Sequence, residues 1–302
     1  MRRLFAAAAA VLLATAPAAA HVVSDRELQV LRQFPRQFFA PEWKAAGPDR
    51  EGNVPPNRSG RWRSVGYQAP AAHLLLDASA RADTTSAERA WRALDAALVH
   101  QVPGGGFTAE LSDPVDDALW IAGTCRSIAA VTNSAVADRF RLRWALMRPK
   151  LQRAVDHLAA GGDTVLAAHD DDAAALLVLA AAFLLADGTY HDERYGHLGQ
   201  TALARALALQ QPDGRFVGDA HDVARQVRAL EALQSITIYF PSPTLERASA
   251  AAARWASQHR HEVKPPAAAT PAWRSATRHD AEFVLQYAKI RPPAPLGGPP
   301  HE

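Results

Sequence analysis

Aspartate and histidine recur together at four places in the sequence that lie about 55 residues apart. Each place begins a stretch with helical periodicity, and three of the four carry a histidine directly before an aspartate. The aligned residues are Asp116, Asp170, Asp222 and Asp280, with His169, His221 and His279. Because side chains at equivalent ends of neighbouring helices can converge, we expect these groups to share one face of the fold.

Crowded carboxyl groups of this kind could hydrolyse a glycosidic bond. Hydrolysis needs one carboxyl group that stays protonated as the acid and a second, ionised one that acts as base or nucleophile. Neighbouring carboxylates supply both forms by raising one another's pKa. The sequence predicts Asp116 with Asp170 or Asp171 as this pair, and Asp222 as a further catalytic candidate.

The same face could instead cleave a uronate by elimination. That reaction needs a cation to neutralise the sugar carboxylate and a base to remove the adjacent proton. Arg225, Arg278 or a histidine could take these tasks, with a divalent ion held by the aspartates. Hydrolysis and elimination both stay open from the residues alone.

The three histidines and the nearby carboxylates are ligand types suited to a divalent metal ion, Zn²⁺ or Ca²⁺. Neighbouring inner helices stand about 8–10 Å apart, so three such positions need not reach one ion. No cofactor is required by the pattern. His169, His221 and His279 are therefore metal candidates whose alternative is a polar role at exposed helix ends.

Other residues at these helix starts could bind the substrate. Trp62, Tyr67 and Trp273 could stack on sugar faces, or they could fill the ends of the helical ring. Asp117 and Asp280 are grouped with them as substrate-binding candidates. The tryptophans inside the helical stretches are expected in the core.

Every one of the aspartates also has a structural explanation. Asp is favoured at the start of a helix because it accepts from free N–H groups and faces the positive end of the helix dipole. Capping accounts for the aspartates better than for the histidine that precedes three of them.

Helical periodicity runs through the chain, and nothing alternates with period two for long enough to form a sheet. The sequence therefore predicts an all-α fold. The helical stretches are 24–38, 62–80, 86–101, 113–132, 142–160, 170–187, 198–211, 219–238, 244–260 and 277–289. Each period holds one helical hairpin with a charged first helix and an apolar second one, which is the pattern of outer and inner helices.

The motif Q-x-x-x-G-x-F occurs twice between helical stretches, at 101–107 and at 210–216. It resembles the Gln-and-Trp repeat of α/α toroids, found in triterpene cyclases and, more loosely, in prenyltransferases and in secreted polysaccharide lyases and glycosidases. The resemblance covers 87–236, with Phe where Trp is usual and without a D-x-D-D run. It implies an α/α toroid, an incomplete barrel of about five helical hairpins.

The first twenty residues have the charged start, short apolar core and small-residue end of a secretory signal. We expect a signal peptide at 1–20, the toroid domain at 21–290 and a disordered Pro/Gly-rich tail at 291–302. The apolar run of the leader is too short for a stable membrane span. The protein is therefore expected to be secreted or periplasmic, and its single cysteine, Cys125, to be buried.

The nearly balanced charge of the chain bears on which partners it could bind. The chain of 302 residues has 33 Lys and Arg against 31 Asp and Glu, so a nucleic-acid partner held by bulk charge is not expected. The expected function is a secreted carbohydrate-active enzyme, a lyase or glycoside hydrolase, acting on a polysaccharide or other extracytoplasmic substrate at the acidic mouth of the ring. One alternative is a non-catalytic ring that binds a glycan, peptide or protein. A second is a terpenoid cyclase or prenyltransferase-like enzyme.

Overall fold

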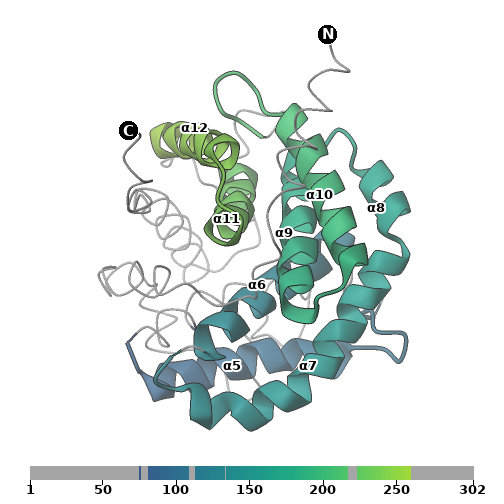
Figure 1. Ribbon diagram of the computed structural model, residues 1–302, viewed down its shortest axis with the longest axis vertical. Helices are drawn as coiled ribbons and strands as arrows, with labels where there is room; N and C mark the ends of the chain where they lie inside the picture. Colours follow the sequence, from purple (N-terminus) through teal and green to yellow (C-terminus); the bar gives the residue numbers. More distant parts are fainter. Residues whose placement is uncertain (1–74, 76–80, 109–112, 133, 217–222, 260–302) are drawn as a thin grey trace, which may run out of the picture.

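The computed structural model describes residue 75 and residues 81–108, 113–132, 134–216 and 223–259 (Figure 1). Over these residues the chain is helical, and the described part contains no strand, which confirms the predicted all-α fold. The elements are α5 Thr84–Ala97, the 3₁₀ turn η4 Leu98–His100, α6 Pro114–Thr132, α7 Ala137–Ala160, α8 Gly162–Ala168, α9 Ala173–Tyr190, α10 Glu193–Ala208, α11 Val223–Tyr239 and α12 Pro243–His259.

Most of the predicted helices are present, with shifted ends. Gly161 ends α7, and the short α8 follows it before the next long helix. That helix, α9, begins at Ala173 rather than at residue 170, because the side chain of Asp172 accepts from the Ala175 N–H and caps it. The predicted helices at 24–38, 62–80 and 277–289 lie outside the described residues except for Leu75.

Helix α9 is the core of the described part. Its residues from Ala173 to Ala186 are all buried, and α6, α10 and α11 pack against it. By length and composition α9 could also cross a membrane, but 78% of it is buried among other helices. The apolar residues all round α9 are therefore accounted for by neighbours on every side.

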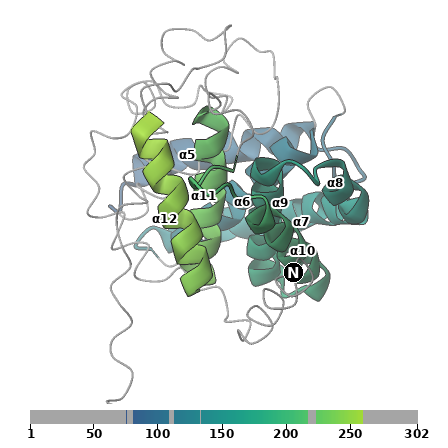
Figure 2. The same cartoon turned by 90° about the horizontal axis from the view of Figure 1, so that it is seen from above.

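The helices form consecutive pairs, α6 with α7, α9 with α10 and α11 with α12 (Figures 1 and 2). The axes of the pairs are not parallel. Figure 1 shows α9 and α10 along their length, whereas α11 and α12 are seen along their length in the turned view of Figure 2. The inner helices α6 and α11 lie against α9. Closure of these pairs into a ring would involve residues outside the described part, so the toroid stays a prediction.

The two Q-x-x-x-G-x-F motifs form the same turn. The Gln101 side-chain amide donates to the Gly105 carbonyl at 2.9 Å and to the Lys150 carbonyl of α7 at 2.8 Å. The Gln210 amide likewise donates to Gly214 at 3.2 Å and to Ala248 of α12 at 3.0 Å. Each glutamine therefore closes its own turn and ties it to a following outer helix.

Glycine is required in these turns for two reasons. Gly105 and Gly214 have φ of +94° and +98°, which side chains rarely adopt. A Cβ on Gly105 would lie 2.1 Å from the Arg153 carbonyl oxygen, and one on Gly214 would lie 2.5 Å from the Ala251 carbonyl. The aromatic end of the motif packs inward, with Phe107 edge-on to Trp120 at 5.3 Å. These contacts confirm the motif as a turn that pins helices together.

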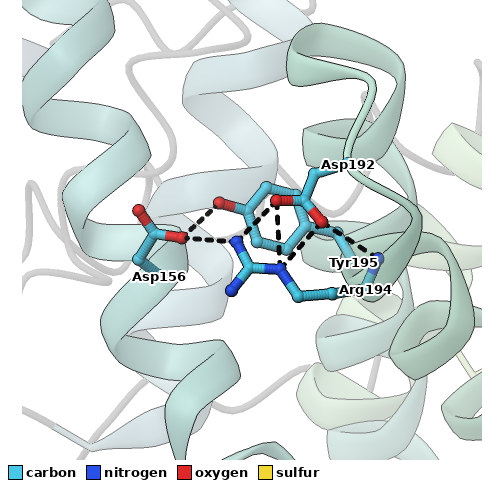
Figure 3. Close-up of polar contacts among 4 residues, drawn as sticks. All are labelled: Asp156, Asp192, Arg194 and Tyr195. Atoms are coloured by element: carbon cyan, nitrogen blue, oxygen red, sulfur yellow. Dashed lines mark hydrogen bonds and ion pairs between the residues drawn. The ribbon is translucent and has the colours of Figure 1, made fainter.

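On the outer surface a polar cluster joins α7 to α10 (Figure 3). The buried Tyr195 hydroxyl donates to Asp156 at 2.6 Å, and Arg194 pairs with Asp192 at 2.6 Å and with Asp156 at 3.3 Å. Burial raises the pKa of Tyr195, so its hydroxyl keeps the proton that this bond needs. These contacts therefore hold α10 against α7.

The single cysteine is buried, as predicted. Cys125 lies within α6 with none of its surface exposed and is a free thiol. Burial raises the pKa of this thiol to about 12, so the reactive thiolate is suppressed near neutral pH. Cys125 therefore acts as a small apolar core residue.

Candidate functional site

The structure describes part of the predicted acidic face. The described candidates are Asp116, Asp117, His169, Asp170, Asp171 and Arg225. The others lie outside the described residues, namely Trp62, Tyr67, His221, Asp222, Trp273, Arg278, His279 and Asp280.

Asp172 and Arg225 connect the starts of two inner helices. Asp172 is the N-cap of α9, and its carboxylate also forms an ion pair with the guanidinium of Arg225 in the first turn of α11. The side chain of Arg225 is half exposed, whereas that of Asp172 is 19% exposed. The starts of α9 and α11 therefore approach each other through Asp172, an acid of the predicted face to which the sequence assigned no catalytic or binding role. Its place just before a run of buried residues is the signal that could have identified it.

The other acids of the 170–172 run are exposed. Asp170 pairs with Arg205 of α10 at 2.5 Å, and Asp171 is an exposed neighbour. His169 is the C-cap of α8, where its N–H donates to the Leu166 carbonyl. It thus marks the end of a short helix rather than the start of an inner one.

The repeat has a different register in the structure. Asp116 is within the first turn of α6, whereas Asp170 precedes the start of α9. The residues at matching positions are Asp113 and Asp172, each directly before an inner helix. Asp113 accepts from the Val115 N–H at 2.8 Å, as Asp172 accepts from Ala175 at 3.1 Å. The aligned motif therefore places two of its aspartates in different local structures.

Asp117 is buried in the first turn of α6, with 5% of its surface exposed. It follows Phe107 at the same interval at which Gln226 follows Phe216. In the second glutamine turn Gln226 accepts from the Phe216 N–H at 2.7 Å and donates to the Gly214 carbonyl at 3.3 Å. The correspondence favours a structural role for Asp117 in bracing the turn.

A second polar cluster lies deeper between inner helices. Arg126 of α6 has 4% of its side chain exposed, and its Nη1 is 3.8 Å from Oε1 of Glu231 in α11. Gln234 and Ser235, also of α11, are buried as well. Burying a guanidinium is costly unless it is paired, so this ion pair constrains how the two helices approach. A charged residue inside an apolar helical stretch was the sequence signal for it.

A metal centre stays a prediction. Across residues 81–108, 113–132, 134–216 and 223–259, no three His, Cys, Asp or Glu side chains converge as a group that could hold an ion. His221 and His279, two of the three predicted ligands, lie outside these ranges.

The electrostatic environment of Asp95, in α5, differs from that of these acids. Burial in α5 raises the pKa of Asp95 to about 6, against the opposing pull of Arg143 and Lys150. Asp95 lies within α5 and not at the starts of α9 and α11.

Comparison with protein-family models, with curated proteins and with solved structures finds no match to this chain. The case for a function therefore depends on the described residues themselves.

Proposed function

We propose that this chain is an exported α/α toroid of about five hairpins that binds an acidic polysaccharide at the starts of its inner helices and cleaves it. Export is supported by the signal-like residues 1–20. Cleavage takes place at the acidic mouth, by elimination or by hydrolysis. The proposed substrate is a uronate-containing polymer because cations and carboxylates alternate there.

The observation that carries the proposal is the ion pair between Asp172 and Arg225. It brings the start of α11 to the start of α9, where Asp170 and Asp171 also lie. Arg205 of α10 adds a second cation through its contact with Asp170. A uronate carboxylate could be held by the half-exposed guanidinium of Arg225, since arginine binds carboxylates with two parallel hydrogen bonds.

Elimination has more support than hydrolysis among the described residues. It uses a cation for the sugar carboxylate, which Arg225 supplies, and a base for the adjacent proton. Hydrolysis by Asp116 with Asp170 or Asp171 needs one of these carboxyl groups to stay protonated near neutral pH. The base for elimination is a carboxylate of the 170–171 pair or a predicted histidine.

A second function, binding without cleavage, is favoured by one specific observation. Asp172 is already engaged as a helix cap and as the partner of Arg225, and Asp170 is engaged by Arg205. Both aspartates therefore have structural tasks that need no reaction.

The test is a screen of the purified protein on acidic and neutral polysaccharides, with and without Ca²⁺ or Zn²⁺. Reducing ends and the ultraviolet absorbance of unsaturated uronates are followed separately. Elimination gives both signals, whereas hydrolysis gives reducing ends alone. Saturable binding with neither signal selects the binding function, and the absence of both binding and turnover on every polymer overturns the proposal.

Single substitutions test whether turnover depends on residues at the starts of α9 and α11. Arg225→Gln and Asp171→Asn should lower turnover at least tenfold with little change in melting temperature. Asp163→Asn is the matched control, because Asp163 is an exposed acid in the first turn of α8. Equal losses in all three variants would contradict a site at the starts of α9 and α11.

A further inference from the structure

The outward face of α7 carries a strip of exposed side chains that the proposed function does not use. We define the α7 strip as Leu142, Leu146, Pro149, Lys150 and Arg153, which are all exposed. Except for the adjacent Pro149 and Lys150, successive members are three or four residues apart. Leu142 is 72% exposed and Leu146 is 64% exposed. Exposed apolar residues that lie together can form an interaction surface.

A third apolar residue belongs to the same region. Val99 of η4 is 81% exposed. The hydrogen bond from Gln101 to the Lys150 carbonyl holds the segment that carries Val99 beside the middle of α7. In the described part of the chain, these three residues are the large hydrophobic side chains that are mostly exposed.

Cations border the apolar residues of the α7 strip. Lys150 and Arg153 continue it. On its flank Arg141 is exposed but pairs with Asp138, and Arg148 lies over the Tyr190 ring at 5.7 Å. Arg139 and Arg143, on the side toward α5, are occupied by Glu88 at 2.7 and 2.9 Å. The outward side of α7 therefore combines apolar and positively charged groups.

We propose that the α7 strip binds the surface of an anionic phospholipid bilayer. Leucine and valine side chains enter the boundary between head groups and acyl chains, while lysine and arginine contact the lipid phosphates. Helix α7 lies along the lower side of the described helices in Figure 1. The contact is peripheral and needs no spanning helix.

Two other occupants fit the strip less well. A second copy of the chain on this face would bring the cations of both copies together, and like charges across an interface are repulsive. A soluble polyanion would satisfy the cations but would leave Leu142, Leu146 and Val99 in water. An anionic bilayer satisfies both kinds of group.

The experiment is co-sedimentation of the purified protein with vesicles of phosphatidylglycerol and phosphatidylcholine, compared with pure phosphatidylcholine. The variants are L142Q/L146Q and K150E/R153E. The control is R247E/R254E, which makes the same change of charge on two exposed arginines of the outer helix α12. All variants share one N-terminus, so any contribution of residues 1–20 cancels.

The wild-type protein should sediment with the anionic vesicles and not with the neutral ones. Each strip variant should weaken its partitioning by about tenfold or more, and the control should stay within about twofold. Every substituted side chain is exposed, so small changes in melting temperature are expected, the largest in K150E/R153E because Lys150 also acts on Asp95. A cooperative melting transition establishes that each variant is folded.

Four results would overturn the proposal. The first is that the wild-type protein does not sediment with anionic vesicles, and the second is that the control loses as much binding as K150E/R153E. The third is that the wild-type protein is a dimer in solution that L142Q/L146Q dissociates. The fourth is that soluble dextran sulfate binds as tightly as the vesicles and that L142Q/L146Q does not weaken this binding. The last two assign the strip to a second copy and to a polyanion.

Discussion

The guanidinium of Arg225 pairs with the carboxylate of Asp172, so that the first turn of α11 is bound to the N-cap of α9. One carboxylate thus serves two helices, since Asp172 also accepts from the Ala175 N–H. The contact links two inner helices that are separated in the sequence by the whole of α10 and a glutamine turn. Asp172 therefore caps a helix and also belongs to the proposed site.

Replacing Asp172 should separate its two tasks. Asp172→Ala removes both the cap and the ion pair and should lower the free energy of unfolding by about 1–2 kcal/mol. Asp172→Asn keeps a capping oxygen, and it should cost less than about 1 kcal/mol because the pair is partly exposed. Urea unfolding measures both, with Asp171→Ala as the exposed neighbour. Equal costs for Ala and Asn at residue 172 would assign the stability to charge instead of capping.

The first glutamine turn should be sensitive at two positions. Gln101→Ala removes two hydrogen bonds to carbonyl groups and should cost about 1–2 kcal/mol, and Gln101→Glu should cost more because a carboxylate then faces those carbonyl oxygens. Gly105→Ala should cost at least about 2 kcal/mol, since it combines a positive φ with a clash against Arg153.

Thermal or urea unfolding checks these values. Gly104→Ala is the matched control, because a Cβ there has no atom within 4 Å. A Gly104 variant as unstable as the Gly105 variant would contradict the role given to the close approach of α7.

Deprotonation of Asp95 should lower the free energy of unfolding as pH rises. Its pKa is raised by burial to about 6 in the folded protein, above the ordinary value of about 4 in the unfolded chain. The folded state therefore binds the proton more tightly, and this contribution is complete below about pH 4 and is lost as pH passes through about 6.

The Asp95→Asn variant tests this pH dependence. It imitates the protonated acid, so it should match the wild type near pH 4 and be more stable than the wild type near pH 8. Urea unfolding at the two pH values measures the difference, with the exposed Asp138→Asn as control. A variant that is less stable at both pH values would show that the Asp95 charge itself is needed.

Cys125 should resist alkylation in the folded protein. It is fully buried and its pKa is raised to about 12, so both access and thiolate are lacking. Iodoacetamide at about pH 8 should leave the native protein unmodified by mass spectrometry and should label the thiol once urea unfolds the chain. Rapid labelling without denaturant would mean that α6 opens locally.

Several features followed from local sequence. The helices were predictable because their apolar residues recur at the helical period, and the two turns because Gln, Gly and Phe stand at fixed intervals. The burial of Cys125 followed from the apolar stretch around it. Helix ends were less predictable, since the start of α9 depends on which of three consecutive aspartates caps it.

The candidate site was predicted less completely. The sequence places Arg225 and the 170–172 run on one face, and the structure brings Asp172 to Arg225. The catalytic roles of Asp170 and Asp171 stay predictions. Asp170 instead pairs with Arg205 of α10, a partner that no repeat alignment contains. Asp116 and Asp170 were aligned as equivalents, although one lies inside its helix and the other before it.

The sequence by itself determined that this chain forms helices with glutamine turns between a charged helix and the apolar helix that follows, because periodicity and turn chemistry act over a few neighbouring residues. The predicted pairing of these two helices was wrong, since each apolar helix packs more against the charged helix that follows it than against the one that precedes it. Only the tertiary structure decided which charged groups meet. The pairs Asp172–Arg225, Arg126–Glu231 and Asp156–Tyr195 each join two helices. Their formation depends on the direction and register in which those helices pack, and this is set by side-chain fit across the core rather than by any local pattern.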